Sequence, residues 1–246
     1  MTRRLDEVLV LRGLVPTRSR ARDAILRGHV TVDGEILRKA GASVLPHAAI
    51  AVADAAGTAY VSRGALKLIA ALDAFSFDVS GRTALDAGAS TGGFTEVLLA
   101  RGARHVTAVD VGHGQLHERL RVDPRIAVIE GRDARSLTSA DIPEPVGAIV
   151  ADLSFIGLAK VLPSLLPLAA GRAWLVALVK PQFEVGREGI GKRGIVTDDK
   201  HRQSALDNVA ECVGATPGWR VTGTIPSPIE GGSGNREFLL GAVHER

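Results

Sequence analysis

The stretch that decides the fold is Thr83-Ala84-Leu85-Asp86-Ala87-Gly88-Ala89-Ser90-Thr91-Gly92-Gly93-Phe94, which joins a short apolar run to a segment with helical spacing. A glycine-rich turn between a strand and a helix lets a ligand approach the backbone closely, at the carboxyl end of a parallel sheet. Ser90 occupies the second glycine position of the dinucleotide pattern G-x-G-x-x-G, and the Gly-Lys-Ser/Thr of a P-loop is absent. The turn therefore predicts a nucleotide-like ligand without favouring a diphosphate.

Apolar runs alternate with helical spacing on both sides of this turn. We expect parallel strands, with helices on both faces of their sheet, at residues 83–87, 106–109, 126–129, 148–151 and 174–179. Two further strands, 221–225 and 238–243, are separated only by a loop rich in Gly, Pro and Ser. A connection without a helix implies an antiparallel pair at the sheet edge. The pattern predicts a Rossmann-like α/β fold with a mostly parallel seven-stranded sheet.

The first part of the chain has a different pattern. Helical spacing over residues 5–12 and 19–27 is followed by a hairpin signal, Asp33-Gly34, between two short strands. Residues 1–47 carry a net charge of +4, whereas the rest of the chain carries −1. We expect a small α+β RNA-binding domain at residues 1–57, a linker at 58–62 and a second domain at 63–246. The alternative for the positive charge is a solvated helix face.

Composition excludes several classes of protein. With 46% hydrophobic residues the chain is globular, and no apolar run approaches the roughly 20 residues of a membrane span. Acidic residues occur from Asp6 onward, where a signal peptide would have its apolar region, so we expect a cytoplasmic protein without a membrane partner. Cys212 is the sole cysteine, and Gly114 stands between His113 and His117 where a zinc protease has Glu, so no metal is expected. A monomer is favoured.

Three carboxylates follow successive strands. Asp86 ends the first, Asp110 ends the second, 22 positions after Gly88, and Asp133 follows the third. Asp110 lies about where an acidic residue binds ribose hydroxyls in doubly wound folds, and Asp133 could accept from an adenine amino group. Three carboxylates repel a diphosphate but suit a sulfonium cation that carries an ammonium group. The alternative is that each carboxylate caps the segment that follows it.

Four segments in order resemble the TlyA (hemolysin A) family of ribosomal RNA 2'-O-ribose methyltransferases. They are residues 86–94, Ala151-Asp152-Leu153-Ser154-Phe155-Ile156, residues 179–186 and Ser233-Gly234-Asn235-Arg236-Glu237-Phe238. Arg4-Leu5-Asp6, Ser19-Arg20 and residues 28–34 resemble the RNA-binding fold of ribosomal protein S-four. The resemblance implies a class I, FtsJ/RrmJ-like methyltransferase domain and the cofactor S-adenosylmethionine. It implies contact with the cofactor at Asp86, Gly88, Ala89, Ser90, Gly92, Gly93, Phe94, Asp110, Val111 and Asp133, and with RNA at Arg3, Arg4, Arg18, Arg20, Arg22 and Lys39.

The resemblance also implies a catalytic Lys-Asp-Lys-Glu set, carried here by Lys67, Asp152, Lys180 and Glu237. A ribose hydroxyl must lose its proton as it attacks the methyl group, and the family assigns that proton to Lys180, with Asp152 as its partner. Asp152 and Lys180 end apolar strands, where charge is costly unless it has a function or a partner. The alternative is two buried ion pairs without catalysis.

Other residues allow two interpretations. Phe155 and Phe183 either contact a flipped nucleotide or belong to the core. Arg187, Lys192 and Arg193 either grip substrate phosphates or lie in a solvated loop. The family usually has Arg-x-Trp-Val where this chain has Thr58-Ala59-Tyr60-Val61, so coupling between RNA and cofactor binding through this tetrapeptide is open.

The target implied by the resemblance is a cytidine ribose in rRNA within ribosomal subunits. The chain begins just before Arg4-Leu5-Asp6 and stops eight residues after Phe238, as in the shorter family members, so we expect 23S rRNA as the preferred target and 16S rRNA as the second candidate. The rival interpretations are a non-catalytic ribosome-assembly factor and a membrane-active hemolysin, which Asp152, Lys160, Pro163 and Pro167 disfavour because they interrupt the most apolar region.

Overall fold

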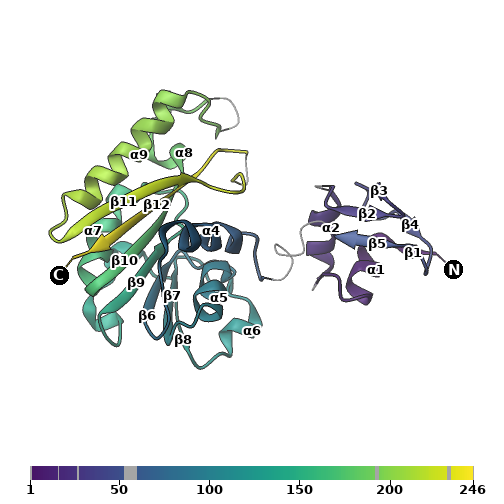
Figure 1. Cartoon of the computed structure of the whole chain (residues 1–246), viewed down its shortest axis with the longest axis horizontal. Helices are drawn as coiled ribbons and strands as arrows, with labels where there is room; N and C mark the ends of the chain where they lie inside the picture. The colour runs from purple at the N-terminus through teal and green to yellow at the C-terminus, as the bar shows by residue number, and fades with distance from the viewer. Residues whose placement is uncertain are drawn as a thin grey trace. The chain divides into compact units, whose positions relative to one another are not determined.

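The structure is a computed structural model of the 246-residue chain, and it describes residues 2–15, 17–26, 28–52, 60–191, 194–231 and 234–245. The side chains of Ser19, Arg20, Asp23 and Arg187 also lie outside the description. The chain divides into two compact units, Met1–Arg63 and Gly64–Arg246 (Figure 1). Because residues 53–59 lie outside the described part, the expected linker at 58–62 stays a proposal.

The first unit packs two helices against short antiparallel strands. Its elements are β1 (Arg3–Arg4), α1 (Leu5–Leu11), α2 (Arg18–Leu26), β2 (Val30–Val32), β3 (Glu35–Ile36), β4 (Ser43–Val44) and β5 (Ile50–Val52), with sheet orders β1-β4 and β3-β2-β5. The β2–β3 turn has φ 51° at Asp33 and 89° at Gly34, the positive values that favour Asp-Gly in a two-residue hairpin. Leu5, Leu9 and Ile25 are fully buried in the core between helices and strands.

The second unit is built on one seven-stranded sheet of order β11-β12-β10-β9-β6-β7-β8. Its strands are β6 (Thr83–Ala87), β7 (His105–Asp110), β8 (Ile126–Glu130), β9 (Val146–Ala151), β10 (Ala169–Val179), β11 (Trp219–Pro226) and β12 (Phe238–His244). The five neighbouring strands β10, β9, β6, β7 and β8 pair in parallel. β12 runs antiparallel to both β10 and β11. The mostly parallel sheet with an antiparallel pair at one edge is thereby confirmed; within that pair β11 forms the edge.

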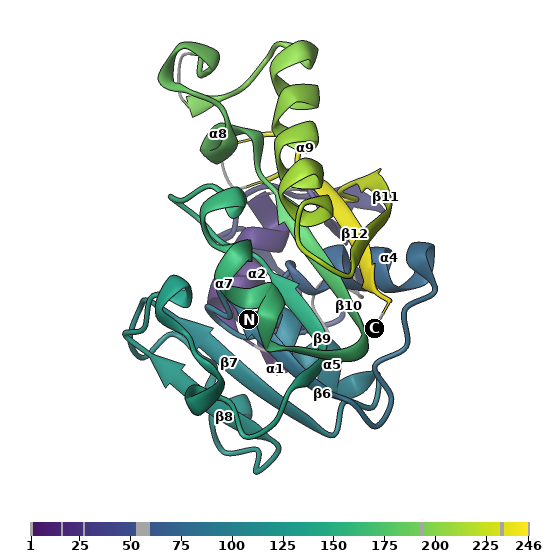
Figure 2. The same cartoon turned by 90° about the vertical axis from the view of Figure 1, so that its left-hand side faces the viewer.

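Helices cover both faces of this sheet, as expected. α4 (Ala65–Phe75) and α5 (Gly93–Ala100) pack on one face, and α7 (Leu162–Leu165) and α9 (Asp199–Gly214) on the other, so α7 and α9 stand in front of the sheet in Figure 2. Two single turns complete the layers, α6 (Glu118–Arg121) after β7 and α8 (Pro181–Glu184) after β10. Covered on both sides, the central strands are almost wholly apolar and buried.

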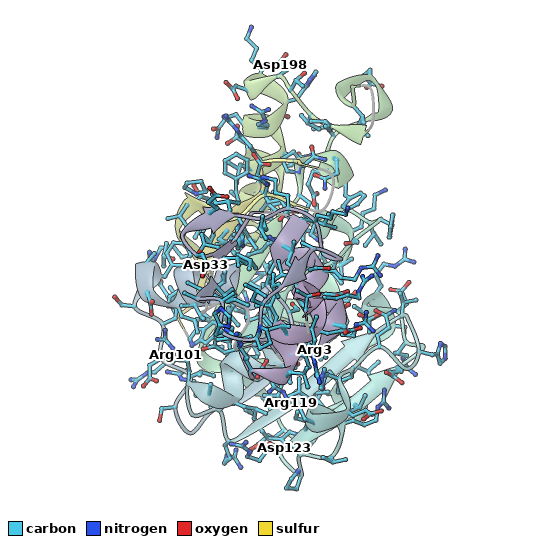
Figure 3. All side chains as sticks on the ribbon, turned by 90° about the vertical axis from the view of Figure 1, so that its right-hand side faces the viewer. Arg3, Asp33, Arg101, Arg119, Asp123 and Asp198 are labelled. Carbon is cyan, nitrogen blue, oxygen red and sulfur yellow. The ribbon has the colours of Figure 1, made fainter. Side chains whose placement is uncertain are left out.

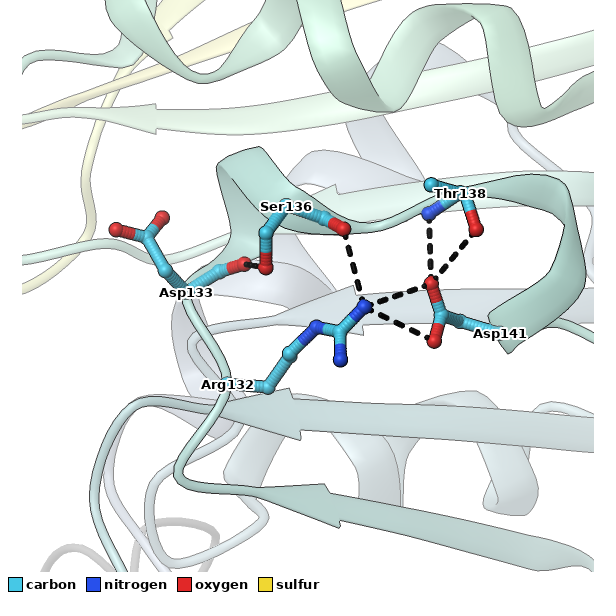
Figure 4. Close-up of polar contacts among 5 residues, drawn as sticks. All are labelled: Arg132, Asp133, Ser136, Thr138 and Asp141. Carbon is cyan, nitrogen blue, oxygen red and sulfur yellow. Dashed lines mark hydrogen bonds and ion pairs between the residues drawn. The ribbon is translucent and has the colours of Figure 1, made fainter.

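The connection from β8 to β9 differs from the expected helix. It contains two 3-10 turns, Ala134–Ser136 and Ser139–Asp141. Arg132 Nη2 donates to both carboxylate oxygens of Asp141 at 3.1 Å and to the Ser136 carbonyl at 3.2 Å, while Thr138 donates to Asp141 through its backbone N and its hydroxyl (Figure 4). The Thr138–Asp141 bonds form the capping box of the second 3-10 turn. Pro143 and Pro145 follow this turn directly, so no regular helix extends from it.

None of the helices in the described part of the chain is both long and apolar enough to cross a membrane.

Candidate active site

Three of the four predicted catalytic residues lie where the parallel strands β9 and β10 reach their carboxyl ends. Asp152 directly follows β9, Lys180 directly follows β10, and Glu237 directly precedes β12. The register pairs Ala151 with Ala177 and Val179 with Phe238, so these strands end together. Lys67, in the first turn of α4, reaches the same end of the sheet and contacts Glu237 there.

The four side chains form two ion pairs. Lys180 Nζ lies 2.7 Å from Asp152 Oδ1 and donates to Ser154 Oγ at 2.8 Å, whereas Lys67 Nζ donates to Glu237 Oε2 at 2.5 Å. The lysines are each 8% exposed and Glu237 is 4% exposed. A buried ammonium requires a partner, and each has one carboxylate within hydrogen-bonding distance. The structure therefore brings the predicted residues together as two neutralised pairs.

The glycine-rich turn owes its glycines to close packing. Gly88 has φ 86°, and a Cβ there would lie 2.4 Å from the Asp152 carbonyl oxygen; Gly92 has φ 96°, and a Cβ there would meet Leu120. Ser90 N donates to Asp110 Oδ2 at 2.8 Å, and Gly112 N donates to the other carboxylate oxygen at 2.7 Å. Asp110 thus fixes the turn to the end of β7, with a free lone pair left on each oxygen.

Asp86 lies beneath this turn and is fully buried. Thr95 Oγ1 donates to its Oδ2 at 2.6 Å, while Oδ1 has no hydrogen-bond partner among the described residues. Burial raises the pKa of Asp86 to about 7; the Thr95 hydrogen bond opposes this and the negative charge of Asp152 adds to it. Because Asp86 is fully buried, its carboxylate can act on a cationic ligand through its charge and not by direct contact.

Asp133 has a local partner. Both of its carboxylate oxygens accept from the Arg135 side chain and Oδ1 also accepts from Arg135 N at 2.9 Å, and these hydrogen bonds lower the pKa of Asp133 to about 2. It caps the 3-10 turn that follows. An adenine amino group would share this carboxylate with Arg135.

A pocket of about 420 Å³ opens beside the turn. Six of the predicted site residues line it, namely Gly88, Ser90, Asp110, Val111, Asp133 and Asp152. The other predicted cofactor residues, Asp86, Ala89, Gly92, Gly93 and Phe94, are not in its lining. Ala89 and Phe94 are buried, so they support the turn from behind.

Several residues of the site were missed at the level of sequence. Ser154 accepts a hydrogen bond from Lys180, and Thr95 donates one to Asp86. Gln115 lines the pocket and accepts from Ser90 Oγ at 3.2 Å, which no motif signalled. Asn235, 1% exposed, accepts from Val196 N and donates to the Gly194 carbonyl, both at 2.9 Å. It thus ties the loop before α9 to the segment that precedes β12 and contains Glu237. Its place within the Gly234-Asn235-Arg236-Glu237 motif was the available signal.

Phe155, which lines the pocket, packs its ring against that of Phe183. Their ring centroids are 5.4 Å apart. Phe155 lines the pocket, is 92% exposed and has φ 66°. The core interpretation of Phe155 is therefore wrong, because its backbone turns the ring outward, whereas Phe183 is half-buried. Lys192, Arg193 and the Arg187 side chain lie outside the described residues, so their expected role stays untested.

The predicted RNA-binding residues of the first unit are exposed cations. Arg3, labelled in Figure 3, Arg22 and Lys39 are exposed. Arg4 Nε and Arg18 Nη2 lie 3.0 and 3.2 Å from the carboxylate of the fully buried Asp6. One buried anion thus holds two guanidinium groups at the surface. The Arg20 side chain is among those not described.

Comparison with known proteins agrees with this geometry. Residues 60–243 match the FtsJ-like methyltransferase family and residues 3–50 match the S4 domain. The chain is 49% identical over 237 residues to the 16S/23S rRNA (cytidine-2'-O)-methyltransferase TlyA of Mycobacterium tuberculosis, covering 96% of this chain and 88% of that protein. It is 37% identical to Hemolysin A of Brachyspira hyodysenteriae, covering 96% and 98%. A solved structure from Streptococcus thermophilus, provisionally named a hemolysin, superposes with a TM-score of 0.77 at 38% identity, covering 99% and 88%.

The family match spans the whole sheet and both ion pairs, and the expected class of enzyme, a methyltransferase that uses S-adenosylmethionine, is confirmed. The chain, with an S4 domain at its start, belongs to the FtsJ-like methyltransferase family.

Proposed function

We propose that the chain transfers a methyl group from S-adenosylmethionine to the 2'-hydroxyl of a cytidine ribose in ribosomal RNA. The observation that carries this proposal is the buried amine nitrogen of Lys180, held 2.7 Å from Asp152, a residue that also lines the pocket beside the glycine-rich turn. A base candidate at the rim of a ligand pocket is the arrangement that proton removal during methyl transfer requires. The rRNA cytidine is the target in the name of the 49% identical relative.

The pocket suits the cofactor. Its volume of about 420 Å³ lies in the range of small-molecule sites, and Asp110, Asp133 and Asp152 line it. Arg132 is the single cation in that lining, so the pocket favours a cationic ligand over a diphosphate. Asp86 Oδ1 lies below with an unused acceptor. When bound, S-adenosylmethionine supplies an electrophilic methyl group.

Each of the four predicted catalytic residues has its own role in this reaction. Lys180, in its neutral form, accepts the proton from the 2'-oxygen, and Asp152 neutralises the ammonium that results. Ser154 keeps the Lys180 amine in place. Lys67 and Glu237, paired at 2.5 Å, position the ribose. All four residues come from one chain, so we propose that a monomer acts, on ribosomal subunits in the cytoplasm.

Tritiated methyl transfer tests the proposal. The full chain is incubated with S-adenosylmethionine and unmethylated small or large ribosomal subunits, and the labelled nucleotide is mapped. We expect label on a ribose 2'-oxygen of a cytidine. Label on a base, or no label on either subunit although rRNA is bound, would instead support a base methyltransferase or the non-catalytic assembly factor.

Asp86 makes cofactor binding depend on pH. Asp86 does not line the pocket, so it attracts a cationic ligand only through the charge of its ionised carboxylate. With a pKa of about 7 the group is mostly protonated at pH 6 and mostly ionised at pH 8. We expect the Kd for S-adenosylmethionine to fall about tenfold from pH 6 to pH 8 in titration calorimetry. Asp86→Asn should abolish that dependence. Thr95→Val, which removes the hydrogen bond that favours the ion, should move it to higher pH.

The same ionisation lowers stability. The pKa of Asp86 is raised from 3.8 to about 7, so the folded protein holds a proton that the unfolded chain has lost. Stability contributed by this group is therefore present below about pH 4 and is lost as pH rises through about pH 7. In thermal unfolding without cofactor, Asp86→Asn should flatten this decline; an unchanged slope in the variant would refute the assignment.

A further inference from the structure

A second pocket, of about 500 Å³, lies beside the Lys67–Glu237 pair. Its wall is formed by the first turns of α9, the end of β11 with the loop after it, and the start of β12. Glu237 and Phe238 belong to its lining, and Phe238 pairs with Val179, the residue before Lys180. The pocket therefore adjoins the catalytic residues, and it shares no lining residue with the cofactor pocket.

Most of the charges in this lining are already neutralised. Arg202 forms an ion pair with Asp199 and donates to the Val196 carbonyl at 2.8 and 3.1 Å, while Glu237 binds Lys67. Glu230 and Arg236 remain, both exposed, and neither has an ion-pair partner among the residues that the structure describes. One residue with an unused carboxylate and one with an unused guanidinium thus line the same pocket.

This pair of charges selects the ligand. A phosphate offers only acceptors and would be repelled by Glu230, and an amine would be repelled by Arg236. A nucleobase with an exocyclic amino group and a ring acceptor satisfies both at once, the amino group facing Glu230 and the acceptor facing Arg236. Pro226, Ile229 and Phe238 add apolar surface against which the face of a base can pack.

We propose that this pocket receives an unstacked, amino-bearing nucleobase of the RNA substrate, close to the nucleotide that is methylated. The inference rests on the proposed function, because it takes RNA as the substrate. It assigns to Glu230 and Arg236 the reading of a base next to the target, a role separate from proton transfer at Lys180.

Footprinting tests the pocket without methyl transfer. Dimethyl sulfate modifies the ring nitrogens of adenine and cytosine that Arg236 would face. The full chain is mixed with unmethylated ribosomal subunits and S-adenosylhomocysteine. We expect protection of one adenine or cytosine besides the target, lost in Glu230→Gln and Arg236→Gln. Arg220→Gln is the matched control: Arg220 is an exposed arginine at the other end of β11, paired with Glu245, and its variant should keep the protection.

Kinetics supply the second readout. Each variant should raise the KM for subunits about tenfold, leave kcat within twofold, and bind S-adenosylmethionine like the wild type. The inference is overturned if protection persists in both variants, if kcat falls while KM is unchanged, or if Arg236→Gln reduces the salt dependence of binding by about one phosphate contact. If the wild type protects the second base yet labels neither subunit, the pocket stands and the proposed methyl transfer fails.

Discussion

Replacement of Lys180 by methionine is expected to lower kcat for methyl transfer at least 100-fold, while the Kd for S-adenosylmethionine changes less than threefold. General-base catalysis contributes about 10² to 10⁴ in rate, and the lysine acts mainly in the transition state. Methionine keeps the unbranched apolar stem of the side chain at this buried position and ends one atom short of the amine. The variant removes the amine without opening a cavity.

The fold should survive this change. Asp152, 23% exposed, keeps access to water when its partner is lost, so its charge is not stranded in the core. Circular dichroism and calorimetric cofactor binding check this point. Single-turnover methyl transfer to ribosomal subunits then isolates the chemical step.

Lys180→Arg separates charge from proton transfer. Arginine can restore the ion pair with Asp152 but does not release its proton near neutral pH, so this variant should be nearly as inactive as the methionine one. Ser154→Ala, which removes only the 2.8 Å hydrogen bond to Lys180, should lose far less activity. Activity of Lys180→Arg within tenfold of the wild type would assign Lys180 a purely electrostatic role.

The sequence predicted more of the second unit than of the first. Every predicted strand of the large sheet is present, because each is a buried apolar run between polar segments. The strands β1 and β4 were not predicted, because two residues show no periodicity. The helix expected between β8 and β9 is replaced by two single 3-10 turns, which Asp133 and Asp141 cap. Pro143 and Pro145 end the segment before a helix can extend.

Site residues could be predicted where they follow directly after a predicted strand. They could not be predicted from local pattern where the fold brings together residues that are far apart in the sequence. Asp86, Asp110 and Asp152 follow from their places at strand ends. The pairing of Lys67 with Glu237 joins residues 170 positions apart, and only the resemblance placed them together. The outward ring of Phe155 depends on a positive φ, and the pocket beside Glu237 depends on the packing of α9, which no local pattern encodes.

Removal of residues 1–57 is expected to weaken productive RNA binding at least tenfold while leaving the cofactor site intact. The cofactor pocket is lined only by residues between Gly88 and Val161, and the second unit has its own core around Leu85, Ile149 and Leu175. The shortened chain would lack residues 1–47 and with them a net charge of +4. A fragment of residues 58–246 should therefore bind S-adenosylmethionine like the full chain but methylate subunits at least tenfold more slowly at physiological salt.

The salt dependence of binding shows whether those charges act on phosphates. Each phosphate contact contributes about 0.9 to the slope of log K against log salt on a duplex and about 0.7 on a single strand. The full chain should show a steep slope and the fragment a shallow one. In the full chain, Arg22→Gln should reduce the slope by about one contact, whereas Arg125→Gln, an exposed arginine of the second unit paired with Asp123, should not. A fragment that methylates subunits at the full-length rate would show that the basic unit is dispensable and would leave the second unit alone to select the RNA.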